Sequence, residues 1–542
     1  MCEPVRSYLF CACVCAHAHD EQVRAVKFFF FFFFFFFPRA HTPKRMRPTF
    51  RRADVPGRPA PARHLTRARA TTPASTPGPV IAVVGGGAAG LAAAFFAATT
   101  AGATNARVLI LERNPECGKK ILISGGTRCN ALPAVPVPPD GGGGAFHHAG
   151  RPAALRGVLG SWTVDACRAW LAAEAGIDLV EEAGTAKLFP AVGAAGGVRD
   201  GLVAAAARAG ADVRVGARVV RLERRGGGAP SSSSSSAAAA VALDDTPPPW
   251  CLTLESGATL HAHAVILATG GLSYPGLGAT GDGLGMAAGV GHTLAQPHPA
   301  LAPLLGSHPG GGVGGLGATH LAGLAVRTAT LFVQEEGKKK RVAPLLSASP
   351  RSDFLFTHRG FSGPAILDAS HHLSAAFTAG RPPPALVARW VKEMGPGEWG
   401  ALLAAAGGAP VSSCLKGRLP ARLVAALLAD AGIAPDQRAA ELNAGDKDRL
   451  AGVLGAYPLA VTGVDGGWGK AEVTAGGVPL AEVEARTLES TLAPGLHVCG
   501  ELLAPAGRLG GFNFYWAWAG GRVAGVGAVG TAVRAWEESR RG

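Results

Sequence analysis

The feature that most constrains the fold of this chain is a glycine cluster, GGGAAG, placed between an apolar run and a segment of strong helix formers. Residues 80–84 (VIAVV) are apolar and rich in β-branched side chains, which predicts a buried parallel strand. Residues 91–98 predict the helix. In the spacing GxGxxG, Gly85 permits a tight turn, Gly87 lets the backbone approach a pyrophosphate, and Gly90 lets helix and strand pack closely. The helix N-terminus would then face the phosphates.

The context of this cluster matters, because a chain with 77 glycines is expected to match the bare pattern about 1.5 times by chance. Only the match at Gly85 follows a buried-strand pattern and opens a helix. A second predicted strand, residues 107–111, ends at Glu112, 22 residues after Gly90. An acid there can accept hydrogen bonds from both hydroxyl groups of an adenosine ribose, and it favours an unphosphorylated ribose, hence FAD or NAD. The alternative is a glycine-rich turn beside a surface glutamate.

The net charge of +14 is concentrated at the N-terminus, where residues 1–79 hold 13 Lys and Arg against 4 Asp and Glu. The remaining residues carry an excess of only +5, which implies no nucleic-acid-binding patch. Six of the ten cysteines lie beyond this leader, without CxxC or Cys/His zinc spacing. This pattern fits a reduced intracellular protein with no metal site. We expect a small-molecule substrate and no nucleic-acid partner.

Residues 1–78 are interpreted as a disordered leader. Its ten consecutive phenylalanines, 28–37, are fewer than the roughly 17–25 apolar residues of a bilayer span, so no membrane span is expected. From Met46 onwards the leader has seven arginines and one acid, a composition typical of an organelle transit peptide. A chloroplast or other plastid is favoured, with the mitochondrion and the cytoplasm as alternatives. Residues 131–152 and 226–249, rich in Gly, Pro and Ser, predict flexible surface inserts.

Three further segments favour a cofactor longer than NAD. Residues 117–130 (CGKKILISGGTRCN) place a glycine-rich loop with two lysines where an NAD-dependent dehydrogenase would begin its next crossover helix. Residues 265–271 (VILATGG) predict a strand that runs into a glycine turn, and TGDG follows at 280–283. Residues 496–501 (LHVCGE) predict a strand that ends in a Gly–acid pair, whose carboxylate could reach a ribityl chain. In this order the segments favour FAD.

At these residues the sequence resembles the BaiN-type (YhiN-type) FAD-dependent oxidoreductases, relatives of the glutathione-reductase-like flavoproteins. The resemblance extends from about residue 80 to residue 528. It rests on the runs GKKILISGGTRCN (118–130), KLFP (187–190), ATGGLSYPGLGATGDG (268–283), GHTLAQPHPALAPL (291–304), FTHRGFSGPAILDAS (356–370), AEVTAGGV (471–478), TLES (487–490) and GELLAPAGRLGGFNFYWAWAGG (500–521).

The resemblance implies a non-covalent FAD and a set of residues that hold it. They are Gly85, Gly87, Ala88, Ala89, Gly90, Glu112, Arg113, Lys120, Ser124, Gly125, Gly126, Cys129, Asn130, Val219, Thr269, Gly270, Gly271, Asp282, Gly500, Glu501, Gly511, Phe512 and Asn513. It also implies reduction of an activated C=C bond, as in a ring-shaped enone, with NAD(P)H as electron donor. No second dinucleotide fingerprint is evident, so NAD(P)H would bind transiently or not at all.

The chain departs from the family pattern at three places. Ala504 stands where the family has an aspartate, three residues after the Gly–Glu pair. Thr127 stands where the family has glycine, and Phe512-Asn513-Phe514-Tyr515 replaces a Tyr-Asn-Leu-Gln-like run. Loss of an aspartate beside the flavin bears on cofactor affinity and redox tuning more than on the fold.

The expected architecture is α/β: a three-layer, Rossmann-type FAD-binding domain with a parallel sheet and a β-meander. It is discontinuous, with parts at 79–300 and 465–535. Residues 301–464 form an inserted substrate or cap domain, first β and then helical from 385 to 455. Residues 213–223 predict a strand whose backbone near Val219 meets the adenine.

Two residues are candidates for catalysis. His358, in FTHRGFSGP, is the candidate proton donor because imidazole titrates near neutral pH; the alternative is a structural histidine in a tight turn. Arg128 could neutralise the pyrophosphate or hold a substrate carboxylate, or it could form a salt bridge within the fold. Cys129 has no partner at CxxC spacing, which favours a packed residue over a redox thiol.

The leading functional hypothesis is an FAD-dependent reductase or dehydrogenase of a small organic substrate. Two alternatives remain open: an FAD-bound RNA-modifying or RNA-binding protein, and a non-catalytic flavin-binding redox sensor. The sequence contains no GxSxG elbow, HExxH helix or Walker A motif, so hydrolase and ATPase functions have no support. Substrate and oligomeric state are left open.

Overall fold

The computed structural model describes residues 78–102, 104–137, 144–147, 152–225, 248–311, 320–334 and 353–541. The predicted leader, apart from its last residue, and most of the insert 226–249 lie outside these ranges, and so does the expected transit peptide. Within the described ranges, no helix combines the length and apolar character that crossing a bilayer would require.

A five-stranded parallel sheet forms the core of the cofactor half. Its order is β22 (Leu496–Val498), β11 (Ala264–Leu267), β1 (Val80–Val84), β2 (Arg107–Leu111) and β7 (Asp212–Arg214). Every neighbouring pair is parallel. The central strands are almost wholly buried, which is why their sequences are continuous apolar runs and do not alternate. The predicted α/β fold class is confirmed.

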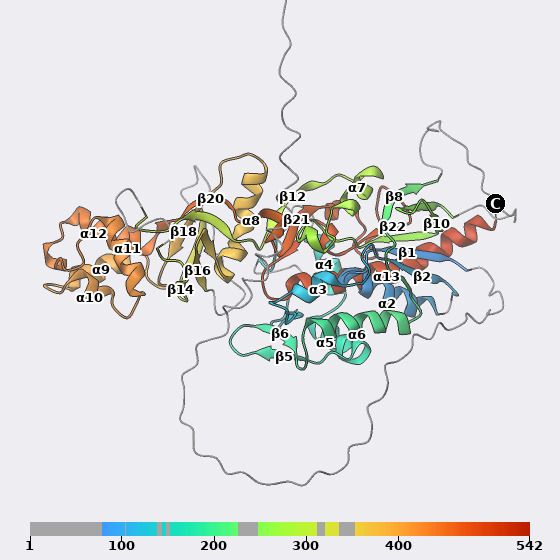
Figure 1. Ribbon diagram of the computed structural model, residues 1–542, viewed down its shortest axis with the longest axis horizontal. Helices are drawn as coiled ribbons and strands as arrows, with labels where there is room; N and C mark the ends of the chain where they lie inside the picture. The colour runs from blue at the N-terminus through green and yellow to red at the C-terminus, as the bar shows by residue number, and fades with distance from the viewer. Residues whose placement is uncertain are drawn as a thin grey trace, which may run out of the picture. The chain divides into compact units, whose positions relative to one another are not determined.

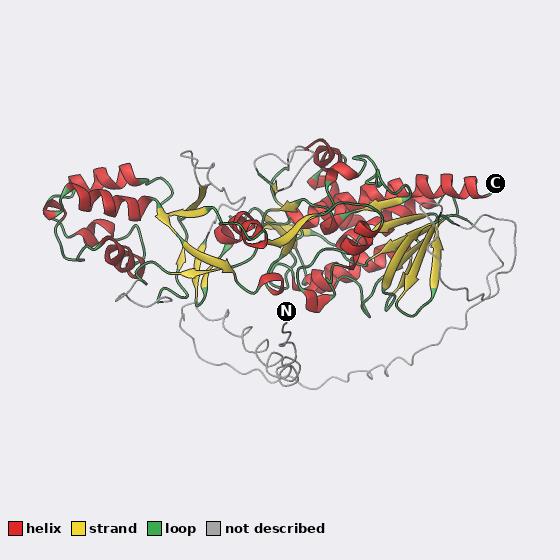
Figure 2. Cartoon of the chain, turned by 90° about the horizontal axis from the view of Figure 1, so that it is seen from above, coloured by secondary structure: helices red, strands yellow, loops and turns green. Residues whose placement is uncertain are grey.

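Helices cover one face of this sheet, where α2 (Ala88–Ala101) and α13 (Phe512–Ser539) pack on one another and on the strands (Figure 1). An antiparallel meander of β8 (Val219–Arg224), β9 (Trp250–Leu254) and β10 (Thr259–Ala262) forms a further layer against β1. Figure 2 shows the strands and helices of these layers in yellow and red. The predicted single strand at 213–223 is wrong: β7 and β8 are separate strands that belong to different sheets.

The cofactor half contains further helices and three small sheets. The helices are α3 (Lys119–Ile123), α4 (Pro152–Gly160), α5 (Val164–Ala175), α6 (Ala195–Arg208) and α7 (Asp282–Gly289). Three small sheets join β3 (Leu132–Pro133) with β6 (Lys187–Pro190) and β5 (Leu179–Glu182), β4 (Phe146–His147) with β23 (Ala506–Gly507), and β12 (Ala295–Ala300) with β21 (Val473–Gly477).

The interpretation of residues 131–152 as a flexible surface insert is corrected by the part of it that the structure describes. Leu132 and Phe146 are buried in the main hydrophobic core. Phe146 packs edge-on against Phe512 with ring centroids 6.1 Å apart. The segment therefore carries apolar anchors despite its Gly- and Pro-rich composition.

The inserted segment has a hydrophobic core of its own, whose buried residues run from Leu304 to Leu459. One sheet joins β14 (Ala325–Val326), β16 (Phe354–Thr357), β17 (Gly360–Ser362), β13 (Leu304–Ser307) and β20 (Ala460–Val464). Another joins β15 (Thr330–Gln334), β18 (Ala385–Arg389) and β19 (Tyr457–Pro458). The helices are α8 (Pro364–Thr378), α9 (Pro396–Ala405), α10 (Val411–Leu415), α11 (Ala421–Ala431) and α12 (Ala444–Gly455). The segment expected to be helical from 385 thus begins with a strand.

We expect Gly525→Ala to destabilise the protein by about 1–3 kcal/mol, because overpacking a close contact forces backbone shifts. A Cβ at Gly525 in α13 would lie 2.3 Å from the carbonyl oxygen of Ala93 in α2. Gly530→Ala, on the exposed side of the same helix, is the matched control and should stabilise it by about 0.5–1 kcal/mol. Urea denaturation of both variants measures the difference, and equal midpoints would contradict the close α2–α13 contact.

Candidate cofactor site

The candidate site lies at the carboxyl ends of the parallel strands, where open α/β sheets bind ligands. The glycine loop follows β1, Glu112 follows β2, the turn at Thr269 and Gly270 follows β11, and Gly500 and Glu501 follow β22. Since these four strands are adjacent in the sheet, residues from across the chain meet at one edge.

The glycine loop fits a dinucleotide. A Cβ at Gly85 would lie 2.6 Å from the Ala268 carbonyl oxygen, and one at Gly90 would lie 1.9 Å from the Gly85 carbonyl oxygen. Both glycines are therefore required by packing. A Cβ at Gly87, by contrast, would meet no heavy atom within 4 Å, so this glycine borders open space at the N-terminus of α2. That is where a pyrophosphate would approach the free N–H groups.

Glu112 is buried at the end of β2, where its carboxylate orders the loop. Oε2 accepts a 2.8 Å hydrogen bond from the backbone N–H of Gly86. Oε1 accepts 2.8 Å bonds from the backbone and the side-chain amide of Asn114. Two carboxylate oxygens offer about four acceptor positions, so one remains for a ribose hydroxyl. The carboxylate both shapes the glycine loop and keeps capacity for the ribose.

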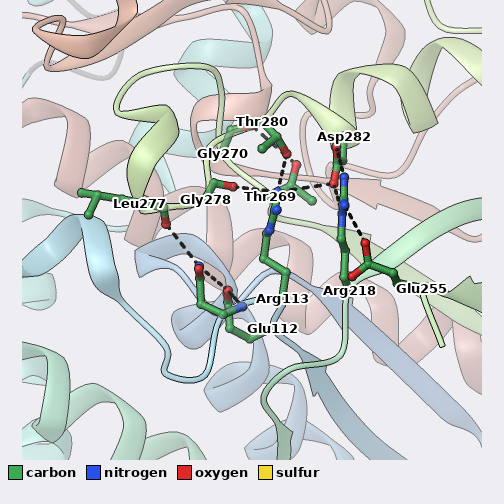
Figure 3. A network of polar contacts seen from close by, with 11 residues as sticks. Glu112, Arg113, Arg218, Glu255, Thr269, Gly270, Leu277, Gly278, Thr280 and Asp282 are labelled. Atoms are coloured by element: carbon green, nitrogen blue, oxygen red, sulfur yellow. Dashed lines mark hydrogen bonds and ion pairs between the residues drawn. The ribbon is translucent and has the colours of Figure 1, made fainter. Parts of the chain in front are cut away.

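Arg113 and Asp282 belong to an ion-pair network beside Glu112 (Figure 3). Arg113 Nη1 donates to Thr280 Oγ1 at 2.6 Å and lies 3.6 Å from Asp282 Oδ2. Arg218 donates hydrogen bonds to Asp282 from both Nε (2.9 Å) and Nη2 (3.2 Å), and it also forms a salt bridge with Glu255. Hydrogen bonding to Arg218 lowers the pKa of Asp282. The network joins the end of β2 to the N-terminus of α7.

Lys120 and Glu501 connect the two sequence-distant parts of the cofactor half. Lys120 Nζ on α3 lies 2.6 Å from Glu501 Oε2. Glu501 Oε1 accepts a 2.8 Å bond from the backbone N–H of Thr474 in β21. A Cβ at Gly500 would lie 2.6 Å from the Cβ of Ala89, so this turn also closes on the start of α2.

The loop from Ser124 to Asn130 contains several residues with positive φ. Gly125, Gly126, Thr127 and Cys129 have φ of 54°, 65°, 69° and 58°. Cys129 is fully buried, and burial raises the pKa of its thiol to about 12, so the thiol stays protonated and is not a redox nucleophile. Among the described residues, the Asn130 Oδ1 atom is buried without a hydrogen-bond partner, which suits a loop that faces a bound group.

The N-terminus of α13 supplies the last predicted contacts. Gly511 has φ of 90°, and a Cβ there would lie 2.3 Å from the Leu132 carbonyl carbon. The side chain of Asn513 exchanges two 2.8 Å hydrogen bonds with the backbone of Gly507. Its amide therefore fixes the preceding loop, while the first-turn backbone N–H groups are not capped by a side chain. Val219, predicted at the adenine, is buried at the start of β8.

The structure also brings together charged residues that the sequence reasoning missed, which we call the polar cluster: Lys187, Asp368, His371, Glu472 and Arg508. Asp368, on α8 of the inserted segment, accepts a 2.7 Å hydrogen bond from the Leu509 backbone and lies 3.9 Å from the Arg508 Nε. Lys187 and Asp368 both act electrostatically on Glu472. The cluster thus links the inserted segment to the loop that precedes α13.

Two further histidines, His147 and His372, extend the cluster. The ring of His147 stacks on that of His371 at 3.5 Å between centroids, and His371 lies 3.9 Å from His372. Burial, reinforced by the neighbouring histidines, lowers the pKa of His371 well below its usual value, so it is neutral at pH 7. Ser370 Oγ accepts a hydrogen bond from the Ala302 backbone N–H, and Ser374 Oγ donates one to the Pro299 carbonyl oxygen. These bonds hold α8 against the segment around β12.

The two residues predicted to be catalytic lie in different surroundings. His358 is exposed in the turn between β16 and β17, beside Arg359, which pairs with Asp465. Arg128 forms a 2.8 Å salt bridge with Glu182, and its guanidinium lies 4.1 Å above the Phe189 ring. The salt bridge within the fold, one of the two alternatives for Arg128, is therefore present.

A sequence signal for the polar cluster did exist. Lys187, Asp368, Glu472 and Arg508 all fall inside the family-like runs KLFP, FTHRGFSGPAILDAS, AEVTAGGV and GELLAPAGRLGG. Asp368 and Arg508 are charged residues of mainly apolar or glycine-rich runs, and both are buried. Charged side chains are rarely buried without a partner or a task.

The fold and the site define the class of the protein: it is an FAD-dependent oxidoreductase with a Rossmann-type cofactor domain. The chain belongs to the HI0933-like family, since the model of the HI0933-like protein Rossmann domain matches residues 79–527. This confirms the family assignment made from the motifs.

Among similar proteins is a ribosomal RNA dihydrouridine synthase of Escherichia coli strain K12, which is 30% identical over 428 residues, 77% of this chain and 91% of that protein. A 3-dehydro-bile acid delta(4,6)-reductase of Clostridium scindens is 29% identical over 442 residues, 78% of this chain and 93% of that protein. A solved 3-ketosteroid delta1-dehydrogenase from Sterolibacterium denitrificans superposes with a TM-score of 0.42 at 13% identity, covering 83% of this chain and 99% of that one.

Gly87→Ala should leave the fold intact but lower FAD affinity by at least about tenfold, because a methyl group would occupy the space of the pyrophosphate. Gly197→Ala in α6, where a Cβ also meets nothing within 4 Å, is the matched control and should retain FAD. Released flavin per mole of folded protein gives the readout. Equal flavin content in both variants would remove Gly87 from the cofactor site.

Thr127→Gly should raise the free energy of unfolding by about 1 kcal/mol, since a left-handed conformation costs a non-glycine residue about 1–2 kcal/mol. Thr127 has φ of 69°. Thr259→Gly, at an exposed position in β10, should instead lower stability. Thermal unfolding of both variants measures the two changes in stability. A loss of stability in Thr127→Gly would contradict the strain at this position.

Proposed function

We propose that this oxidoreductase reduces a C=C bond conjugated to a carbonyl group, with NAD(P)H as the source of electrons. The observation that carries the proposal is the polar cluster, in which Lys187 and Arg508 lie beside Asp368 and Glu472 next to the predicted flavin residues. A conjugated C=C bond is reduced by adding a hydride to one carbon and a proton to the other. Negative charge develops on the carbonyl oxygen as the hydride arrives.

The residues of the chain can meet these requirements. FAD, when bound, supplies the hydride chemistry, and the protein supplies orientation and electrostatics. The buried Arg508 guanidinium and the Lys187 ammonium would stabilise the developing negative charge. Asp368 holds the Leu509 backbone and lies against Arg508, so it orients the cation. The stacked histidines would form an apolar wall with hydrogen-bonding edges for a planar ring.

A second substrate class is favoured by a specific observation. A relative 30% identical over 91% of its length is a ribosomal RNA dihydrouridine synthase. The uracil ring also contains a C=C bond conjugated to a carbonyl group, so the same chemistry would serve.

The test is an anaerobic experiment on the purified, FAD-loaded chain. We expect NADPH or NADH to bleach the oxidised-flavin absorbance, and one substrate to restore it: either a Δ4,6 3-dehydro-bile acid or a ribosomal RNA transcript. Mass spectrometry should find two hydrogens added to the bile acid or to uridine. Gly87→Ala, depleted of FAD, is the control. Bleached flavin that neither substrate reoxidises would contradict the proposal.

A further inference from the structure

We propose that Thr474 is a positioning residue for FAD: it holds together the two turns, after β11 and after β22, that carry predicted FAD residues. Thr474 lies in β21 and is fully buried. Since a fully buried side chain does not line an open space, Thr474 would act on the cofactor through its neighbours. The role concerns FAD alone, so its test does not depend on the substrate proposed above.

The hydroxyl group of Thr474 fixes the turn after β11. Oγ1 accepts a 2.8 Å hydrogen bond from the Leu272 backbone N–H and a 3.2 Å bond from that of Ser273. It also lies 3.2 Å from Ser273 Oγ. A threonine hydroxyl has two acceptor lone pairs and one proton. Because the two N–H groups occupy both lone pairs, the proton of Thr474 is donated to Ser273 Oγ, and the whole capacity of the hydroxyl serves this one turn.

The approach of Thr474 to this turn is too close for a side chain in between. A Cβ at Gly271 would lie 2.3 Å from Thr474 Oγ1 and 2.5 Å from Thr474 Cβ. Gly270, the preceding residue, has φ of 74°. Both glycines are predicted FAD residues. Their backbone therefore lies where the hydrogen bonds and the contact surface of Thr474 place it.

The backbone of Thr474 fixes the second turn, after β22. Its N–H donates a 2.8 Å hydrogen bond to Glu501 Oε1, while Lys120 Nζ lies 2.6 Å from Glu501 Oε2. Glu501 and Lys120 are both predicted FAD residues. Because β11 and β22 are neighbours in the parallel sheet, the turns that follow them meet at one edge. Thr474 is bonded to both turns and so sets the spacing between them.

Thr474 also lies where the inserted segment joins the cofactor half. β21 pairs with β12, and Thr474 stands opposite Pro299 in that pair. The Pro299 carbonyl oxygen accepts the hydrogen bond from Ser374 on α8. Figure 1 shows α8, β12 and β21 next to one another. The helix that carries Asp368 is thus connected through Thr474 to the turns expected to hold FAD.

A buried threonine that only stabilised the fold would have a different effect. Loss of its hydroxyl would lower the unfolding temperature and leave the FAD affinity of the folded protein unchanged. Thr531 on α13 is suited as that control. It is buried, and its hydroxyl bonds to Glu489 Oε2 at 3.1 Å and to the Gly527 carbonyl oxygen at 3.3 Å. Within the described residues, none of its hydrogen bonds reaches a predicted FAD residue.

The experiment compares the full chain with Thr474→Val, Thr474→Ser and Thr531→Val by measuring the dissociation constant of FAD from its fluorescence. Thr474→Val leaves two buried N–H groups without an acceptor, so we expect the dissociation constant to rise about tenfold or more. Thr474→Ser keeps the hydroxyl and should stay within about threefold of the wild type. Thr531→Val should unfold at a lower temperature with unchanged FAD affinity. Unchanged affinity in Thr474→Val, or an equal loss in Thr474→Ser, would overturn the role.

A second measurement needs no variant and holds even if Thr474→Val fails to fold. Amide hydrogen exchange of the wild type, followed by mass spectrometry on peptides that span residues 268–275, reports on the Leu272 and Ser273 N–H groups. Since their acceptor belongs to the protein, these groups should exchange slowly in the FAD-free chain as well as in the FAD-loaded one. Exchange that is slow only with FAD bound would mean that the cofactor orders the turn, and would overturn the role of Thr474.

Discussion

The close packing of α13 on α2 is the interaction on which the cofactor half depends. Cβ atoms at Gly521 and Gly525 would lie within 2.5 Å of carbonyl oxygens in α2, so only glycines allow the two helices to approach this far. One helix begins at the predicted pyrophosphate loop, and the other ends the described chain. Their contact brings the N-terminus of each to the same edge of the sheet, where positive helix ends favour an anionic cofactor.

This arrangement explains why a domain can be inserted without disturbing the cofactor half. β22 returns to the sheet by parallel pairing with β11, and β21 pairs with β12 across the same boundary. The inserted segment leaves and re-enters at neighbouring strands and keeps a separate hydrophobic core. Helix α8 of this segment carries Asp368 to the loop before α13 and His371 to His147 of β4. The inserted segment can therefore vary while the sheet edge stays fixed.

Burying charged residues of the polar cluster lowers the stability of the fold, which argues that they serve a function. Asp368 and Arg508 are buried, and burial lowers the pKa of Arg508. Burying charges costs free energy even when they are paired, and apolar residues of similar size would often stabilise a fold as well. Groups with perturbed pKa values tend to concentrate at functional sites.

The sequence by itself determined the cofactor half. Short apolar runs at 80–84, 107–111 and 265–267 favour buried strands of a parallel sheet, and GxGxxG is informative only between such a strand and a helix. Each of these patterns is local, so it can be recognised from one short segment of the sequence. The sequence also placed Glu112 and Glu501 at strand ends, because the strand itself predicts where its last residue lies.

Only the tertiary structure decided which charged residues meet. Lys187, Asp368, Glu472 and Arg508 come from β6, α8, the start of β21 and the loop before α13, and no periodicity relates positions so far apart in the chain. The same holds for His358 and Arg128: their motifs were recognisable, but only the fold placed His358 in an exposed turn and Arg128 beside Glu182, which lies opposite Lys187 in the β5–β6 pair. Chemistry that depends on distance between side chains is fixed by packing, and packing is a property of the whole fold.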